Sequence, residues 1–131
     1  MSRQVVVTEG APSAVGAYSQ GVKTEKFVYT AGQLGLVPST KQFAGADIQS
    51  QTRQSLENVK AVLEAGGSSM QHVLKVTVFM IDLREFGPMN EVYASFFPVD
   101  PPARSAIQVA ALPLGGRVEI EAVGKVVDAE D

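Results

Sequence analysis

The segment 101–125 constrains the fold more than any other part of this sequence. Pro101 and Pro102 lack a backbone N–H and push the residues before them into extended geometry, so no helix can run through this point. Residues 106–109 are largely apolar, residues 118–122 alternate between apolar and charged, and a Leu-Pro-Leu-Gly-Gly break lies between the two runs. The pattern predicts a strand, a turn and a second strand.

The same segment carries a guanidinium and two carboxylates. Arg104 stands where the first apolar run begins, and Glu119 and Glu121 share one face of the second strand because side chains alternate along a strand. The planar fork of arginine suits a carboxylate, since it donates two parallel hydrogen bonds to the two oxygens. Arg104 is therefore a candidate carboxylate-binding residue, and the alternative is an ion pair with one of the chain's own acids.

Composition indicates one globular domain that spans residues 1–131. The sequence is 45% hydrophobic and 19% charged, and no apolar run approaches the roughly 20 residues that a membrane-spanning helix requires. The first nine residues do not resemble a secretory signal, so we expect a cytoplasmic protein without a membrane partner. A formal net charge of −3 gives no basic surface for nucleic acid, which is not favoured as a partner.

The residues that usually bind metals or form covalent intermediates are scarce. Zero cysteines exclude disulfides, thiolate metal ligands and a cysteine nucleophile. His72 is the one histidine, and it follows a Gly-Gly-Ser-Ser stretch that predicts a surface loop. We therefore expect neither a metal site nor an organic cofactor.

Helical periodicity occurs twice. The first helix is predicted to begin after Asp47, a suitable N-cap, and to stop at Gly66 and Gly67. The second is predicted to take Gly87 as N-cap and Pro88 as its first residue. Its apolar residues recur with the helical period, and they are Met89, Val92, Tyr93 and Phe96.

Strand-like runs at residues 5–7, 27–31 and 73–81 surround the first helix in sequence. With the two runs of the segment 101–125, they predict an α+β fold, a mixed sheet of about five or six strands with helices packed on it. Two helices can cover only one face of such a sheet. Apolar strands without a further cover predict a neighbouring copy of the chain, and thus a homo-oligomer.

Three further residues are candidates for a site. Tyr18 leaves a breaker-rich loop, where a tyrosine suits either the edge of the core or a binding cleft. Gly32 ends the strand 27–31, where it permits a close approach of backbone or ligand, or a bulge. Asn90 lies off the apolar stripe of the second helix, so it either bonds locally or contacts a ligand.

Seven segments together resemble the Rid (YjgF) family, and its reactive intermediate deaminase A branch in particular. They occur in the same order along almost the whole chain, and they are Gly16-Ala-Tyr18-Ser-Gln20, Thr30-Ala-Gly32-Gln33, Arg53-Gln-Ser-Leu-Glu-Asn58-Val, Val76-Thr-Val-Phe79, Met89-Asn90-Glu-Val-Tyr93-Ala-Ser-Phe96-Phe97, Pro102-Ala-Arg104-Ser and Val118-Glu119-Ile-Glu121-Ala.

The resemblance implies a chorismate-mutase-like fold, a homotrimer and three clefts between subunits. It also implies an activity, the hydrolysis of 2-imino and 2-enamino acids to 2-keto acids and ammonia. Such intermediates, 2-iminobutanoate and 2-iminopropanoate among them, are released by pyridoxal-phosphate-dependent serine and threonine dehydratases.

The resemblance also implies residue roles. The arginine matching Arg104 binds the substrate carboxylate, and the glutamate matching Glu119 is placed to handle the attacking water. The residues matching Tyr18, Asn90 and the strand end Ala31-Gly32 line the cleft. Arg104, Glu119 and Tyr18 are thus the catalytic candidates, and Arg104, Asn90, Ala31, Gly32 and Tyr18 are the candidates for substrate binding.

Two positions depart from the bacterial pattern of the family. Ala106 stands where many members carry cysteine, which excludes a thiol-dependent activity. Ala31 stands where many carry serine, so a side-chain hydrogen bond is lost at that position.

The implied chemistry fits the residues. An imine carbon is already electrophilic, so the protein need supply only a carboxylate clamp, a positioned water and a proton route. Glu119 suits the role of base or of water-orienting group, and general acid–base catalysis typically contributes about 10²–10⁴-fold. Two alternatives stay open: a non-catalytic module that binds small carboxylates through Arg104, and an endoribonuclease, which the acidic charge and the lone histidine disfavour.

Overall fold

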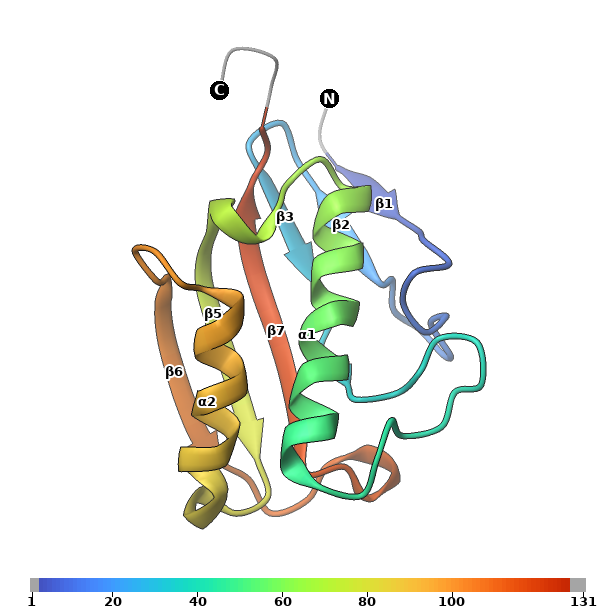
Figure 1. The fold of residues 1–131 in the computed structure, drawn as a ribbon. Helices are drawn as coiled ribbons and strands as arrows, with labels where there is room; N and C mark the ends of the chain where they lie inside the picture. Colours follow the sequence, from blue (N-terminus) through green and yellow to red (C-terminus); the bar gives the residue numbers. More distant parts are fainter. Residues whose placement is uncertain (1–2, 128–131) are drawn as a thin grey trace.

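The computed structural model describes residues 3–127, which form a mixed sheet with two helices (Figure 1). Three short 3₁₀ turns lie between the main elements, at Met70–His72, Leu83–Glu85 and Pro113–Gly115. In chain order the main elements are β1 (Gln4–Val6), β2 (Gly21–Lys23), β3 (Phe27–Thr30), β4 (Gln33–Leu34), α1 (Ile48–Ala65), β5 (Val73–Met80), α2 (Phe86–Phe96), β6 (Ala103–Gln108) and β7 (Val118–Lys125). The α+β class and the alternation of strands and helices are confirmed.

The sheet has seven strands in the order β1-β2-β3-β7-β5-β6, with β4 paired to β7. The β5–β6 pair is parallel and the other pairs are antiparallel. The sequence patterns account for five of these strands and miss β2 and β4, which have three and two residues, too short to show a period. The two strands of the segment 101–125 are not neighbours, because β5 lies between β6 and β7.

The first helix has the predicted limits and the second does not. At α1, the Asp47 carboxylate accepts a hydrogen bond from the Ser50 N–H at 2.9 Å, and Gly66 follows the last helical residue. The prediction that α2 begins at Pro88 is wrong, because the helix already begins at Phe86. Pro88 is tolerated two positions further in, since the N–H groups of a first turn have no intrahelical partner.

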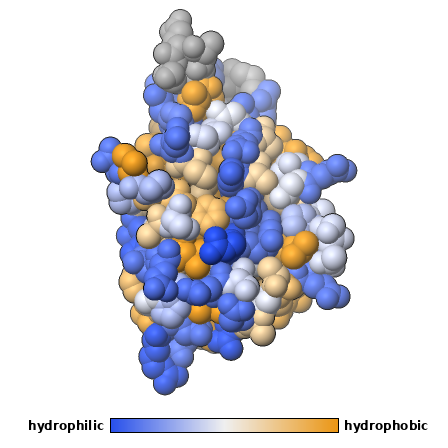
Figure 2. Space-filling model, in the orientation of Figure 1, coloured by the Kyte–Doolittle hydropathy of each residue, from blue (hydrophilic) through white to orange (hydrophobic). Residues whose placement is uncertain are grey.

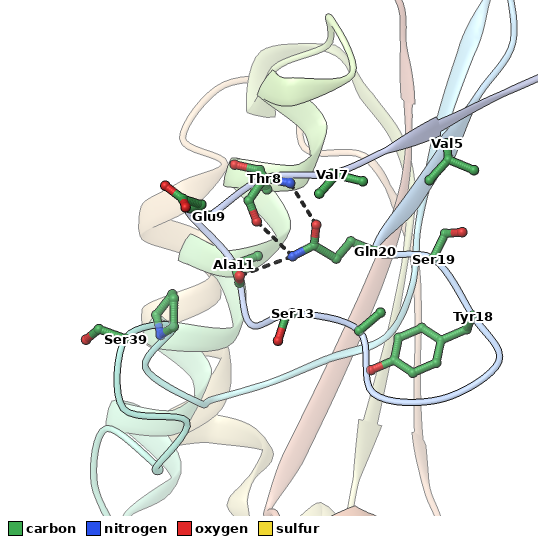
Figure 3. A pocket seen from close by; sticks show the side chains of 12 residues that line it. Val5, Val7, Thr8, Glu9, Ala11, Ser13, Tyr18, Ser19, Gln20 and Ser39 are labelled. Atoms are coloured by element: carbon green, nitrogen blue, oxygen red, sulfur yellow. Dashed lines mark hydrogen bonds between the residues drawn. The ribbon is translucent and has the colours of Figure 1, made fainter.

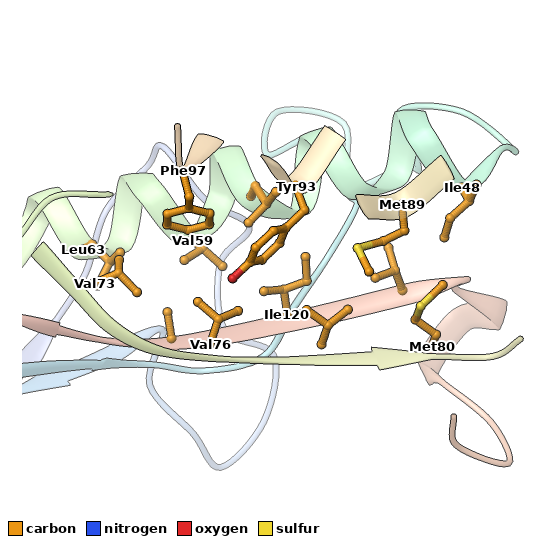
Figure 4. Packing of buried hydrophobic residues seen from close by; sticks show 14 of the residues in the cluster. Ile48, Val59, Leu63, Val73, Val76, Met80, Met89, Tyr93, Phe97 and Ile120 are labelled. Atoms are coloured by element: carbon orange, nitrogen blue, oxygen red, sulfur yellow. The ribbon is translucent and has the colours of Figure 1, made fainter. Parts of the chain in front are cut away.

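The core lies between the two helices and one face of the sheet (Figure 4). Residues of α1, α2, β5 and β7 supply most of it, and its largest fully buried members include Leu56, Leu63, Met80, Met89 and Ile120. Both helices cover the same face (Figure 1). Hydrophilic side chains are spread over the outer surface of this helix-covered side (Figure 2).

The opposite face of the sheet has no helix over it in residues 3–127. Strand register places on it the residues that alternate with the core set. Its apolar members are half-buried or exposed, and they include Val22, Phe27, Tyr29, Phe79 and Val123. We call it the open face. None of the helices in the described residues is long and apolar enough to span a bilayer.

Candidate active site

The Arg104 guanidinium lies on the helix-covered side of the sheet, beneath α2. In the β5–β6 register Arg104 pairs with Val76, a core residue, so the two side chains share a face. Its central carbon is 5.1 Å from the centroid of the Phe86 ring and 4.7 Å from that of Tyr93. Its Nη1 donates a 2.6 Å hydrogen bond to Asn90 Oδ1. These distances fit cation–π contacts with both rings.

The alternative of an ion pair between Arg104 and one of the chain's own acids is not observed. Among residues 3–127, Arg84 pairs with Asp82 and Arg117 pairs with Glu85, whereas Arg104 has no carboxylate within ion-pair distance. The amide oxygen of Asn90 accepts from Arg104, 14 residues further along the chain, so this bond is not a local one, and the ligand contact of Asn90 stays a prediction. The guanidinium therefore keeps its charge and several donors for an external anion.

Sequence reasoning missed the role of Phe86 and Tyr93 beside Arg104. Tyr93 was assigned to the core, and it is indeed buried, with its side chain directed from α2 toward the sheet (Figure 4). Burial raises the pKa of its hydroxyl to about 12, against a lowering by the charge of Arg104. Tyr93 therefore stays a neutral phenol. The spacing of Phe86, Asn90 and Tyr93 along one helix face was the signal that could have found the group.

Glu119 lies on β7, on the open face, and Gly32 gives its carboxyl group room. A Cβ added at Gly32 would lie 2.8 Å from the Glu119 carboxyl carbon, a separation that real Cβ atoms do not show. The close approach predicted at Gly32 is therefore made by a side chain, that of Glu119. Burial, and next the charge of Glu121, raise the pKa of the Glu119 carboxyl. A carboxyl group in this position is suited to exchange a proton nearer neutrality than usual.

Ala31 and Tyr18 lie toward the same end of the sheet as Gly32. The Ala31 N–H donates to the Gln20 carbonyl at 2.8 Å, which ties the strand end to the loop that carries Tyr18. Tyr18 is 51% exposed, so the alternative of a core-edge tyrosine does not hold. Its hydroxyl accepts a long hydrogen bond from the Val15 N–H at 3.3 Å.

Tyr18 also lines a pocket of about 880 Å³ (Figure 3). Thr8, Ser13 and Ser39 contribute hydroxyls to its wall. The buried Gln20 side chain holds the loop at its rim, since it bonds the N–H and the carbonyl of Thr8 and reaches the carbonyls of Ala11 and Pro12.

The candidate residues form two groups that do not meet within one chain. Arg104 and Asn90 are together on the helix-covered side, whereas Glu119 and Gly32 are together on the open face. The parity of β7 requires this, because Ala122 faces the core with Val76 and Arg104, and Glu119 is an odd number of residues away. The sheet itself separates the guanidinium from the carboxyl group.

The described residues hold no cluster of three or more His, Asp or Glu side chains that could bind a metal. His72 is in the 3₁₀ turn before β5, where its Nδ1 lies 2.7 Å from Ser69 Oγ. This contact joins two side chains three residues apart and is local to the turn.

Comparison with known proteins identifies the family. The family described as endoribonuclease L-PSP matches residues 8–126. The chain belongs to this family, also called YjgF. A RutC family protein of Pyrococcus horikoshii is 47% identical to it over 92% of this chain and 96% of the relative. The 2-iminobutanoate/2-iminopropanoate deaminase of Rattus norvegicus is 43% identical over 92% of this chain and 88% of its own.

Among solved structures, E. coli TdcF with bound serine superposes with a TM-score of 0.91 at 43% identity, over 95% of this chain and 99% of TdcF. The resemblance read from the sequence is confirmed at the level of the family. The structural neighbours of this YjgF family member also support the fold that the resemblance implied.

Proposed function

We propose that this YjgF family member is a deaminase that hydrolyses 2-imino and 2-enamino acids to 2-keto acids and ammonia. The observation that carries the proposal is the charged, acid-free guanidinium of Arg104, oriented by α2 and left with donors for a carboxylate. The rat relative, named for this activity, and TdcF, solved with an amino acid bound, support it.

The chemistry needs no covalent bond between the substrate and the protein. Arg104 binds the substrate carboxylate, and the Glu119 carboxylate takes a proton from water as the water oxygen bonds to the imine carbon. The Glu119 carboxyl then returns this proton to the amino nitrogen of the carbinolamine, and the C–N bond breaks as the hydroxyl becomes the carbonyl of the 2-keto acid. The departing ammonia takes the hydroxyl proton and leaves as ammonium. The balance is one iminium acid and one water in, one 2-keto acid and one ammonium out.

We propose further that the complete site forms between copies of the chain in a homotrimer. Arg104 and Glu119 lie on opposite faces of one sheet, so a site that uses both requires a second copy. The apolar open face is a suitable surface for that contact. Tyr18 and the Ala31-Gly32 strand end then line the cleft from the side of Glu119.

A coupled assay tests the activity. A threonine dehydratase supplies 2-iminobutanoate, semicarbazide traps it, and the protein competes by converting it to 2-oxobutanoate. We expect Arg104→Ala to abolish the diversion and Glu119→Gln to weaken it by about 10²-fold, with both variants folded. Arg84→Ala is the matched control, since Arg84 is an exposed arginine paired with Asp82. Unchanged turnover by Arg104→Ala would refute the clamp.

Mixing two inactive variants tests the shared site. Arg104→Ala and Glu119→Gln chains, refolded together, form hybrid oligomers in which some clefts receive both native residues. Recovery of activity above that of either variant supports a site shared between copies. Absence of recovery, in a sample that native mass spectrometry shows to contain mixed trimers, contradicts it. Tight 2-oxobutanoate binding without turnover would instead favour the non-catalytic binding module.

A further inference from the structure

We propose that three residues on one face of α2, Phe86, Asn90 and Tyr93, are positioning residues that fix the Arg104 guanidinium without neutralising it. We call these three residues the α2 cradle. The inference rests on the proposed function for the identity of the ligand, a carboxylate, but not for the geometry of the cradle itself.

Helical spacing brings the cradle together. Residues three or four apart on a helix are neighbours on its surface, so Phe86, Asn90 and Tyr93 follow one another along one face. Arg104 reaches this face from β6, which lies at one edge of the sheet. Its guanidinium carbon lies 5.1 Å and 4.7 Å from the two ring centroids, and the amide of Asn90 lies between the rings in sequence.

The two rings reduce the freedom of a long side chain. Arginine has many rotamers in solution, and a ligand that must select one of them binds more weakly. Contacts with two aromatic rings favour the rotamer that lies against α2. The structure thus holds the guanidinium in place before a ligand arrives.

The amide completes the cradle and keeps the charge. Arg104 donates only, so the oxygen of Asn90 must face it, and the 2.6 Å bond to Nη1 sets the orientation of the guanidinium about its last bond. An aspartate would make the same contact with a negative charge and would compete with the ligand. A neutral acceptor orients the cation and leaves its charge for the carboxylate.

Asn90→Asp separates a positioning role from a merely structural one. The substitution keeps the size of the side chain and its acceptor oxygen, so we expect the thermal midpoint to stay the same or rise. We expect the affinity for 2-oxobutanoate, measured by calorimetry, to fall at least tenfold, because the new carboxylate neutralises Arg104 and repels the ligand. An equal affinity in a folded Asn90→Asp variant would overturn the role of the amide.

Phe86→Leu tests the rings, with Phe96→Leu as the matched control on the same helix. We expect Phe86→Leu to weaken 2-oxobutanoate binding about tenfold and to raise KM with little change in kcat.

A ligand-free measurement distinguishes failure of the cradle from failure of the proposed function. The Nε–Hε resonance of Arg104 in a 15N spectrum should move in Phe86→Leu and stay in place in Phe96→Leu. If it moves while the wild-type protein neither binds nor turns over the keto and imino acids, the cradle stands and the proposed function fails. If it does not move, or if Phe86→Leu and Asn90→Asp bind 2-oxobutanoate normally while Arg104→Ala does not, the cradle is wrong.

Discussion

The two halves of the candidate site are built in opposite ways. On the helix-covered side, three side chains of α2 surround the Arg104 guanidinium. On the open face, the Glu119 carboxyl has its place because Gly32 has no side chain. We therefore expect truncation of a side chain beside Arg104 to impair the helix-covered half of the site. We expect enlargement of the residue beside Glu119 to impair the open-face half.

The two halves of the candidate site also differ in their electrostatics. Arg104 meets a neutral amide and two neutral rings, so its surroundings preserve the charge. Glu119 meets burial and a second carboxylate, which raise its pKa and favour the neutral acid. A permanent cation suits a binding group, and a carboxyl group with a raised pKa suits a proton carrier.

The largest effect in this comparison is expected from Gly32→Ala, which breaks the carboxyl half and spares the guanidinium half. The new Cβ displaces the Glu119 carboxyl, so kcat/KM for 2-iminobutanoate should fall about 10²-fold, as for loss of a general base. The fold should survive, because Gly32 does not have a positive φ and the group that must shift is the end of a flexible side chain. Binding of 2-oxobutanoate should change far less than turnover.

Gly87→Ala provides the control for that experiment. Nothing lies within 4 Å of a Cβ added at Gly87, which is inside α2, so activity should be unchanged. Wild-type turnover by Gly32→Ala would show that the position of the Glu119 carboxyl does not matter for the reaction, and the proposed role of Glu119 as base would be wrong.

A smaller effect, on pH dependence, is expected from Glu121→Gln. Part of the upward shift in the pKa of Glu119 comes from the charge of Glu121, so its removal should lower that pKa. If the Glu119 carboxylate is the base, activity appears as pH rises through its pKa. The acid limb of kcat/KM should therefore move to lower pH in Glu121→Gln and stay in place in the control Glu57→Gln, on α1.

The raised pKa of Glu119 should also make the free energy of unfolding depend on pH. A carboxyl group whose pKa is raised on folding stabilises the native state fully below its unfolded pKa, and this contribution is lost as pH rises through the folded pKa. Glu121→Gln should reduce that loss, so its thermal midpoint should fall less than that of the wild-type protein over the same pH range. An acid limb that does not move would contradict the contribution of the Glu121 charge to the pKa of Glu119.

The helix α2 shows which residues of the site could be predicted from the sequence and which could not. Asn90 was predicted as a candidate for the site and Tyr93 only as a member of the apolar stripe. Phe86 was not placed on the helix at all, because Gly87-Pro88 predicted a helix that begins after it. Proline is acceptable at several positions of a first turn, so it marks a helix start only to within a turn. The error of two residues removed Phe86 from the face that it shares with Asn90 and Tyr93.

Strand order was the second limit. The sequence predicted that Arg104 and Glu119 lie on successive strands, and both do. It did not predict that β5 inserts between those strands, because that order depends on pairing between segments far apart in the chain. The separation of the two residues onto opposite faces follows from parity and from this pairing. Local patterns show the parity within each strand, but they do not show the pairing.

The smallest effect is expected from Tyr18→Phe, which asks whether the loop on the Glu119 side contributes chemistry or only a wall. The Tyr18 hydroxyl has one long bond to the Val15 N–H, and the Gln20 side chain holds the nearby loop independently. Loss of the hydroxyl should thus leave the loop in place and remove at most one neutral hydrogen bond to substrate or water. Such a bond corresponds to a fall of about two- to tenfold in kcat/KM.

The division of that loss between kcat and KM decides the role of Tyr18. A fall in kcat alone indicates that the hydroxyl acts in the proton route beside Glu119, and a rise in KM alone indicates that it contacts bound substrate. Unchanged kinetics would remove Tyr18 from the catalytic residues. A loss in kcat/KM near 10²-fold, as large as the loss expected for Glu119→Gln, would indicate that both residues carry protons in the reaction.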